Sequence, residues 1–441
     1  MKIRYLKQIY TTGLILLMSF YGCKESYLEI PPFGTAFEKN MATETGLNSL
    51  LIGAYRSLQM SSSIWGNVSN MTFSGFATNE FVRGAPSFPH LANFESHRID
   101  ALSVNWLSHA RWAQCYSGIQ RANSVLNVLK NVPEGKLSAK KIAQIQGEAV
   151  FLRAVLHFEL AKVYLNVPYV DESITFSDGN YNVPNTESIW PKIEKDFKFA
   201  IDNLSETIAE RGRANSWAAK CFLAKVYMQQ HKYTEALPLL TDAIENGVTA
   251  GGQKYALNPL FFDNFDAKKK NSAESVFAVQ FAVFDDANSG NENQGMCVAI
   301  PQVPGCEGSG FVGITRATIN TFKTDQETGL PLFETYNDFD LPDNAYISDN
   351  EPFTSYQGTL DSRLDNSIMR RGVPLLDWGM PKSAWSWNKV LQSPYGMRKY
   401  LHYQADRDVL TRSIGWTYFS SINYDMIRFA DVLLLAAECE V

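Results

Sequence analysis

Two short helical segments joined by a polar turn, within residues 214–246, constrain the fold more than any other part of the sequence. The turn lies near His231 and Lys232, and alanines recur on both sides of it. Small alanines let paired helices approach closely, while larger leucine and tyrosine side chains fill the remaining gaps. One such hairpin cannot bury its own apolar face, so it requires stacked helical neighbours.

The apolar residues of this hairpin fall at the positions typical of a tetratricopeptide-type repeat. They are Leu223, Ala224, Tyr227, Ala236, Leu240 and Ala243. Helical periodicity elsewhere in the chain supplies candidate neighbours. These segments are residues 40–59, 103–130, 136–166 and 187–209. We therefore predict a mainly α fold, with a tetratricopeptide-like α–α superhelix over about residues 40–250.

The second half of the chain has a different pattern. From residue 250 to about 420 the helical period is lost, and Gly, Pro, Asp and Asn recur throughout. Residues 272–283 alternate partly and predict one of a few short strands. A long irregular stretch inside a compact domain is usually functional. We expect a large loop-rich ligand-binding region here, and a shorter loop region at residues 60–100.

The last segment, residues 424–441, reads YDMIRFADVLLLAAECEV and predicts a helix with a repeat-like face. Such a face needs a second helix, and neither a capping residue nor a glycine stop ends the segment. We therefore expect an incomplete last repeat, and a whole protein that continues with the partner helix.

The N-terminus has the layout of a secretory signal. Basic residues precede a short apolar run and a small residue, Gly22. The run is too short to span a bilayer, which needs about 20 apolar residues. Cys23 follows at the position of the lipidated cysteine in bacterial lipoprotein signals, although Phe20 stands where leucine is usual. We predict a lipoprotein signal at residues 1–22 and lipidation of Cys23, with a plain secretory signal as the alternative.

Composition and motifs argue against several kinds of partner. The formal net charge of -6 indicates no phosphate-binding surface, so we expect no nucleic-acid partner. The chain has no Cys-x-x-Cys pair, and residues 178–182 begin like a calcium loop but lack the glycine and the final glutamate at the required spacing. We therefore expect no metal and no cofactor. Cys297 and Cys306 flank a Pro/Gly-rich loop and are candidates for a disulfide in an oxidising compartment.

Several segments, in order along the chain, resemble the SusD/RagB family of the Bacteroidetes. They are GCKESYLEIPP, LLIGAYRSL, NWLSHARWAQCYSGIQRANSVL, GEAVFLRAVLHFELAKVYLNVPYV, SAESVFAVQF, LDSRLD, MRKY and IRFADVLLLAAE. The best match is residues 147–170, and the order of the segments is more specific than any one of them. The resemblance covers nearly the whole chain and implies a single SusD-like domain at residues 23–441.

This resemblance implies a surface-exposed lipoprotein of the outer membrane, held there by its N-terminal lipid. It would bind oligosaccharide, or sometimes another nutrient, and cap a SusC-like TonB-dependent transporter. The helical repeats would form the scaffold and the irregular loops the ligand site, because binding residues concentrate on loops that a rigid scaffold positions. The departures from the family pattern are Phe20 and the incomplete last repeat.

Sugar binding needs flat aromatic rings that stack on a pyranose and polar side chains that bond its hydroxyl groups. Two loop stretches of this chain combine both. The candidate carbohydrate-binding residues are Trp65, Asn79, Glu80, Arg83, Trp378, Trp385, Trp387 and Asn388. In an extended segment, Trp385 and Trp387 would present their rings to one side. The alternatives are that these rings cover the scaffold and that the polar residues only stabilise turns.

The charged residues of the best-matching segment have a structural interpretation. We expect Glu148, Arg153 and Glu159 to form buried ion pairs or capping contacts, and Asp361 and Arg363 to form another structural pair.

Enzyme signatures are absent from the sequence. It contains no H-E-x-x-H, G-x-S-x-G or phosphate-loop motif, so we predict binding without catalysis. A glycosidase needs only two placed carboxylates, so a carbohydrate-active enzyme stays an alternative. The other alternative is a repeat-scaffold protein that binds the transporter or a peptide nutrient.

Overall fold

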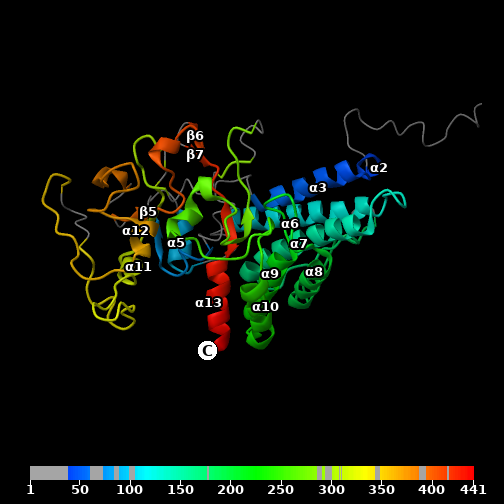
Figure 1. Ribbon diagram of the computed structural model, residues 1–441, viewed down its shortest axis with the longest axis horizontal. Coiled ribbons are helices and arrows are strands. Elements are labelled where there is room, and N and C mark those ends of the chain that lie inside the picture. Colours follow the sequence, from blue (N-terminus) through cyan, green and yellow to red (C-terminus); the bar gives the residue numbers. More distant parts are fainter. Residues whose placement is uncertain are drawn as a thin grey trace, which may run out of the picture.

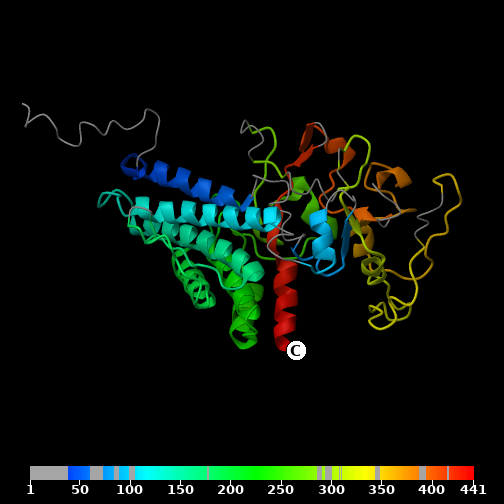
Figure 2. The same ribbon diagram turned by 180° about the vertical axis from the view of Figure 1, so that it is seen from behind.

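The computed structural model describes residues 38–59, 73–83, 89–98, 105–175, 178–285, 291–293, 300–306, 308, 310–342, 348–386, 394–414 and 417–441. A stack of long helices occupies one side of the molecule, and an irregular region occupies the other (Figure 1 and Figure 2). The predicted fold class, mainly α with few short strands, is confirmed.

The helical stack follows chain order. It contains α3 (Glu44–Arg56), α6 (Asn105–Leu129), α7 (Ala139–Tyr164), α8 (Trp190–Asn203), α9 (Ser216–Met228) and α10 (Tyr233–Asn246). Each of α6 to α10 packs on the next, and α3 lies against α6 and α7. The predicted helices are confirmed with small changes at their ends. The first is divided into α2 (Glu38–Met41), α3 and η2 (Ser57–Gln59), and the fourth ends at Asn203 instead of residue 209.

The predicted repeat positions are buried in the pair formed by α9 and α10. Ala224, Ala236 and Ala243 are 0% exposed, so the two helices approach each other on their alanine faces. The larger residues at the remaining positions, Leu223, Tyr227 and Leu240, are also buried. The small residues therefore set the spacing of the pair.

An aromatic cluster centred on α7 joins several layers of the stack. The ring centroid of Phe151 lies 5.9 Å from Phe197 of α8, 5.4 Å from Phe222 of α9 and 5.0 Å from Phe277. The first residue, Phe151, is 0% exposed. Edge-to-face packing of this kind stabilises aromatic pairs beyond their buried area. Because Phe277 belongs to a strand, the same cluster ties the stack to the irregular region.

A two-stranded antiparallel sheet lies at this junction. β2 (Ser275–Val279) pairs with β8 (Tyr424–Arg428), and α13 (Phe429–Glu440) follows β8 directly and packs on α10. α13 lies between the two halves in both views (Figure 1 and Figure 2). The strand predicted within residues 272–283 is confirmed. The single helix predicted over residues 424–441 is wrong for its first 5 residues, because ladder bonds to β2 hold them extended.

Short strand pairs and short helices make up the irregular region. The strand pairs are β1 (Phe81–Arg83) with β3 (Val312–Ile314), β4 (Ile368–Met369) with β5 (Gly396–Met397), and β6 (Thr411–Ile414) with β7 (Thr417–Ser420). The helices are α5 (Pro89–Glu95), α11 (Arg316–Asn320), α12 (Arg363–Ser367), η3 (Phe261–Phe265), η4 (Ala267–Lys269), η6 (Ser383–Trp385) and η7 (Gln404–Asp406). The stretch predicted as loop at residues 60–100 therefore contains β1 and α5.

This region has apolar clusters of its own, apart from the core of the stack. The larger one, which we call the loop core, contains Phe76, Leu91, Phe94, Ile300, Val303, Cys306, Val312, Met369, Leu375, Trp385, Met397, Leu401 and Tyr418. Its members come from segments far apart in the sequence. The loops are therefore positioned by tertiary contacts and not by regular secondary structure.

Ser138 caps α7 and offers a test of local stability. Its Oγ accepts a hydrogen bond from the Lys141 backbone N–H at 3.2 Å, which satisfies one unpaired donor of the first helical turn. We expect Ser138→Ala to lower the free energy of unfolding by about 1 kcal/mol in urea denaturation. Ser138→Asp keeps an acceptor at the cap and should stay close to the wild type. Equal losses in the two variants would contradict this role of the hydroxyl.

Candidate ligand-binding site

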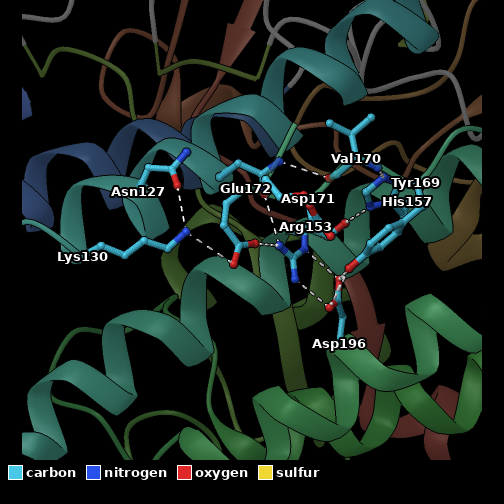
Figure 3. Close-up of polar contacts among 11 residues, drawn as sticks. Asn127, Lys130, Arg153, His157, Tyr169, Val170, Asp171, Glu172 and Asp196 are labelled. Atoms are coloured by element: carbon cyan, nitrogen blue, oxygen red, sulfur yellow. Dashed lines mark hydrogen bonds and ion pairs between the residues drawn. The ribbon is translucent and has the colours of Figure 1, made fainter. Parts of the chain in front are cut away.

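Buried ion pairs make the helical stack a rigid support for the loops. Arg153 of α7 donates to both carboxylate oxygens of Asp196 of α8, at 2.8 and 2.7 Å, and to Glu172 at 2.6 Å (Figure 3). Tyr169 donates its hydroxyl to Asp196 at 2.9 Å. Burial by itself lowers the pKa of the Arg153 guanidinium, but its hydrogen bonds to Asp196 raise that pKa above the usual value. The pair therefore stays charged. The predicted structural role of Arg153 is confirmed.

His157 fastens the segment after α7 to the same cluster (Figure 3). The Val170 backbone N–H donates to His157 Nε2 at 3.2 Å, so the ring proton resides on Nδ1, which donates to the Arg153 carbonyl at 3.1 Å. Burial, and then the charge of Arg153, lower the pKa of His157 to about 3. Both ring nitrogens bond backbone groups, so this histidine is structural.

The other carboxylates that the sequence marked as structural are also paired. Glu159 accepts from Arg111 at 2.5 Å and from Lys162 at 2.7 Å. Burial by itself raises the pKa of Glu159, but these two cations outweigh burial and lower that pKa to about 2. Glu148 accepts from the Tyr55 hydroxyl at 2.7 Å, and burial raises its pKa. These contacts hold helices of the stack together.

Asn79 and Glu80 lie immediately before β1. Their carbonyls accept from the side chain and the backbone N–H of Thr315, at 2.8 and 3.0 Å, so the pairing of β1 with β3 fixes both residues. Both side chains are exposed. Arg83, at the end of the strand, pairs with Glu95 of α5 at 3.3 Å. The structure therefore leaves Asn79 and Glu80 open to a ligand and ties Arg83 to the fold.

Trp378 and Arg407 meet above Gly305. The indole N–H of Trp378 donates to the His402 carbonyl at 2.9 Å, and the half-buried ring packs against the loop core. Gly305 has φ 87°, and a Cβ there would lie 2.8 Å from Arg407 Nη1 and 3.7 Å from Trp378 Cζ3. A side chain at this position would displace the Arg407 guanidinium and would touch the Trp378 ring at an ordinary contact distance. We call Trp378, Arg407 and Gly305 the Trp378 platform.

Sequence patterns did not reveal Arg407, which lies far along the chain from Trp378 and was not among the predicted contacts. Tertiary structure brings the two together through Asp377. Its carboxylate accepts from the backbone N–H groups of Gln404 and Ala405, at 2.6 and 3.0 Å, which anchors the segment that carries Arg407. The only sequence signal is the local alternation of charge around Arg407.

The remaining predicted sugar contacts have different positions. Trp385 lies in η6 within the loop core and is 5% exposed, so its ring face is covered and its backbone is not extended. The prediction that Trp385 presents its ring on one side of an extended segment, together with Trp387, is therefore wrong for Trp385. Trp65, Trp387 and Asn388 lie outside the described residues, and their role in binding sugar stays a prediction.

The predicted covalent and metal features are only partly within the described residues. Cys306 is buried in the loop core, whereas Cys297 and Cys23 lie outside the described part, so the disulfide and the lipidation stay predictions. Where the structure describes the chain, no cluster of three or more His, Cys, Asp or Glu residues could hold a metal ion. Within the same residues, no helix combines the length and the apolar character needed to cross a membrane.

Comparison with known families assigns both halves of the chain. A profile described as "Starch-binding associating with outer membrane" matches residues 27–228, and the SusD family profile matches residues 273–441. The chain belongs to the SusD/RagB family. The first SusD profile covers the helical stack as far as α9, and the second covers β2 and all that follows it.

Curated SusD-like proteins resemble much of this chain. A SusD-like protein of Bacteroides ovatus is 27% identical over 285 residues, which cover 62% of this chain and 49% of the relative. SusD-like protein P2 of Formosa agariphila is 23% identical over 441 residues, which cover 98% of this chain and 77% of the relative. The chain therefore spans about half the length of the first relative.

Solved structures of SusD-like proteins share the fold. A SusD superfamily protein of Bacteroides vulgatus matches with a TM-score of 0.63 at 20% identity, covering 92% of this chain and 76% of that one. A laminarin-binding SusD-like protein matches with a TM-score of 0.61 at 21% identity, covering 90% of this chain and 80% of that one. Surface glycan-binding protein A of Bacteroides thetaiotaomicron, in complex with laminarihexaose, matches with a TM-score of 0.61 at 17% identity. The match covers 90% of this chain and 79% of that one. At these identities the likeness establishes the SusD fold, with its tetratricopeptide-like helical scaffold.

Proposed function

We propose that this chain is a surface lipoprotein of the outer membrane that captures oligosaccharide and passes it to a SusC-like TonB-dependent transporter. Family membership supports the proposal, since one matching profile describes starch binding in association with the outer membrane. Two proteins of the same fold bind laminarin or a laminarin oligosaccharide, according to their names. In this proposal, a lipid on Cys23 anchors the chain, and the loops face the ligand.

The Trp378 platform is the observation that carries the proposal for this chain. A partly exposed indole can stack on the C–H face of a pyranose, and the adjacent Arg407 guanidinium can donate hydrogen bonds to its hydroxyl groups. The indole N–H is already bonded to His402, so the ring is held in place before a ligand arrives. Asn79 and Glu80, which are exposed immediately before β1, are further candidates for contact with the sugar.

The proposed mechanism is capture without chemistry. Rings and polar groups would hold the sugar, no bond would change, and the transporter would remove the ligand. Such a ligand must bind weakly enough to be released. A dissociation constant of about 1 mM, for example, corresponds to a binding free energy of about −4 kcal/mol.

We expect Trp378→Ala to weaken glycan binding by about tenfold or more, because an aromatic anchor often dominates a binding site. Affinity electrophoresis against plant, fungal and host glycans, including laminarin, identifies the ligand, and calorimetry then measures the loss. Trp378→Phe keeps a ring and should retain part of the affinity. Phe199→Ala removes a 38% exposed ring from α8 and should leave binding unchanged.

Three outcomes would contradict parts of this proposal. Equal binding by the wild type and Trp378→Ala would move the site away from the platform. No retardation by any glycan, together with co-purification with the transporter, would favour a protein that binds only its transporter or a peptide. New reducing ends after incubation with polysaccharide would favour an enzyme.

A further inference from the structure

A pocket lies where the helical stack meets the irregular region. Its walls come from α3, η2 and the turn at residues 210–213, and the end of β2 completes it. Its volume is about 370 Å³, within the range of small-molecule sites. None of its lining residues belongs to the Trp378 platform, and neither Asn79 nor Glu80 lines it. We call it the junction pocket.

Apolar side chains form one part of the junction pocket. Ile52 and Tyr55 come from one face of α3, Leu58 from η2 and Val279 from β2. Ile52 is 55% exposed and lies beside the buried Leu58 and Val279, so its side chain is open to a ligand. This surface suits the C–H face of a sugar ring or another flat, weakly polar group.

Arginines form the other part. Arg56, Arg211 and Arg213 line the pocket, and Glu210 is the acidic residue among its lining. Arg213 donates to the buried Glu148 at 3.3 Å and also bonds Asn48, so its charge is compensated. Arg211 is exposed and forms no hydrogen bond or ion pair with the described part of the chain. In a chain of net charge -6, this is a local basic site.

Contacts around the pocket hold the backbone of the turn that carries Arg211 and Arg213 in place before a ligand binds. Gly212 has φ 87°, and a Cβ there would lie 2.4 Å from Gln280 Cγ, so the turn is pressed against the end of β2. The Ala214 backbone N–H donates to the Tyr55 hydroxyl at 2.8 Å, which joins the turn to α3. Groups fixed in this way lose little conformational entropy on binding.

One buried polar atom of the lining lacks a partner. Gln59 is 7% exposed and donates its Nε2 to the Gln280 carbonyl at 2.7 Å, which orients the amide. Its Oε1 has no hydrogen-bond partner in the described structure. A buried acceptor without a donor costs free energy, and a ligand hydroxyl is the kind of donor that is missing.

We infer that the junction pocket binds a carboxylate-bearing sugar, namely a uronic acid unit of an oligosaccharide. Arg56 and Arg211 pair with the carboxylate, a sugar hydroxyl donates to Gln59, and the ring packs on the apolar side chains of α3. The inference rests on the proposed glycan capture and narrows its ligand class to acidic glycans.

Calorimetry with trigalacturonate tests the inference, and its fully methyl-esterified form is the matched neutral probe. We expect the acid to bind at least about tenfold more tightly than the ester, because only the acid can form charge-assisted bonds with arginine. The affinity should fall as salt is added, since exposed charges are screened. Triglucuronate and trimannuronate, as further arms, distinguish which uronic acid fits best.

Variants locate the site. Arg211→Ala should weaken trigalacturonate binding about tenfold without loss of stability, since this side chain is exposed and unpaired in the described structure. Arg121→Ala is the control, because Arg121 donates to the Gly53 carbonyl of α3 at 3.2 Å but does not line the pocket.

The outcomes separate this inference from the proposed function. Equal binding of acid and ester, or acid binding that Arg211→Ala does not change, overturns the junction pocket as a uronate site. Displacement of trigalacturonate by an equal concentration of inorganic sulfate also overturns it, because the site then recognises only charge. Trp378-dependent binding of a neutral glycan without any acid binding overturns the inference and leaves the proposed function intact. Failure of every glycan to bind overturns both.

Discussion

Replacing Arg153 by leucine is expected to lower the free energy of unfolding by about 3–5 kcal/mol, because it leaves a buried carboxylate without its cation. Asp196 is 4% exposed, and Arg153 makes two charge-assisted hydrogen bonds to it. Glu172 loses the same partner. Urea or guanidinium denaturation of the purified chain, starting after Cys23, measures the loss.

The exposed pair of Asp361 and Arg363 provides the matched control. The Nε–H group of Arg363 donates to the two Asp361 carboxylate oxygens at 3.0 and 3.1 Å, so the structural pair predicted from the sequence is present. Its guanidinium is exposed to solvent. Arg363→Ala should therefore cost about 1 kcal/mol or less. The double variant Arg153→Leu/Asp196→Leu removes both buried charges and should recover part of the loss. If Arg153→Leu costs no more than Arg363→Ala, the buried cluster is not what stabilises the stack.

Acid is expected to destabilise the chain through His157. Its pKa is about 3 in the folded chain and about 6.5 when unfolded, so the unfolded state takes up a proton first as the pH falls. The stability that this histidine contributes is complete above about pH 6.5. It is lost by about 1.4 kcal/mol for each pH unit between about 6.5 and 3. Protonation would also place an N–H at Nε2, against the Val170 N–H that donates to it.

The measurement compares the wild type with His157→Gln, which can still accept from Val170 but cannot ionise. The wild type should be the more stable at about pH 7.5, and its advantage should shrink at about 1.4 kcal/mol per unit below about 6.5. A comparison is needed because Asp425 acts in the opposite direction. Burial raises the pKa of Asp425 to about 7, so its contribution grows as the pH falls. A constant difference between the two proteins from about pH 7.5 to 4.5 would refute the role of His157.

Local patterns predicted the helical stack, because helix periodicity is a property of neighbouring residues. The alanine and leucine spacing of residues 214–246 indicated a hairpin that needs stacked partners, and the structure supplies α8 and α13 on either side of it. The charged residues within the segment that best matches the family were expected to be structural, and the structure pairs Glu148, Arg153 and Glu159 with residues of other helices.

The ligand-facing side was only partly predictable. Trp378 stood out as an aromatic residue in a Pro/Gly-containing loop, and the structure leaves its ring partly exposed. Trp385 stood out equally and is buried in the loop core. The place of Arg407 beside Gly305 and Trp378 and the junction pocket were not predicted from the sequence, because their parts come from distant segments that meet only after folding.

The family, the long helices and the irregular character of residues 250–420 follow from the amino-acid sequence alone, because each depends on local composition or on motifs in order. Tertiary structure alone decided that residues 424–428 form a strand, since their partner β2 lies about 150 positions earlier and contributes the hydrogen bonds that hold them extended. It also decided which rings and charges are exposed. Burial depends on which distant segments cover a side chain, and no local pattern encodes that.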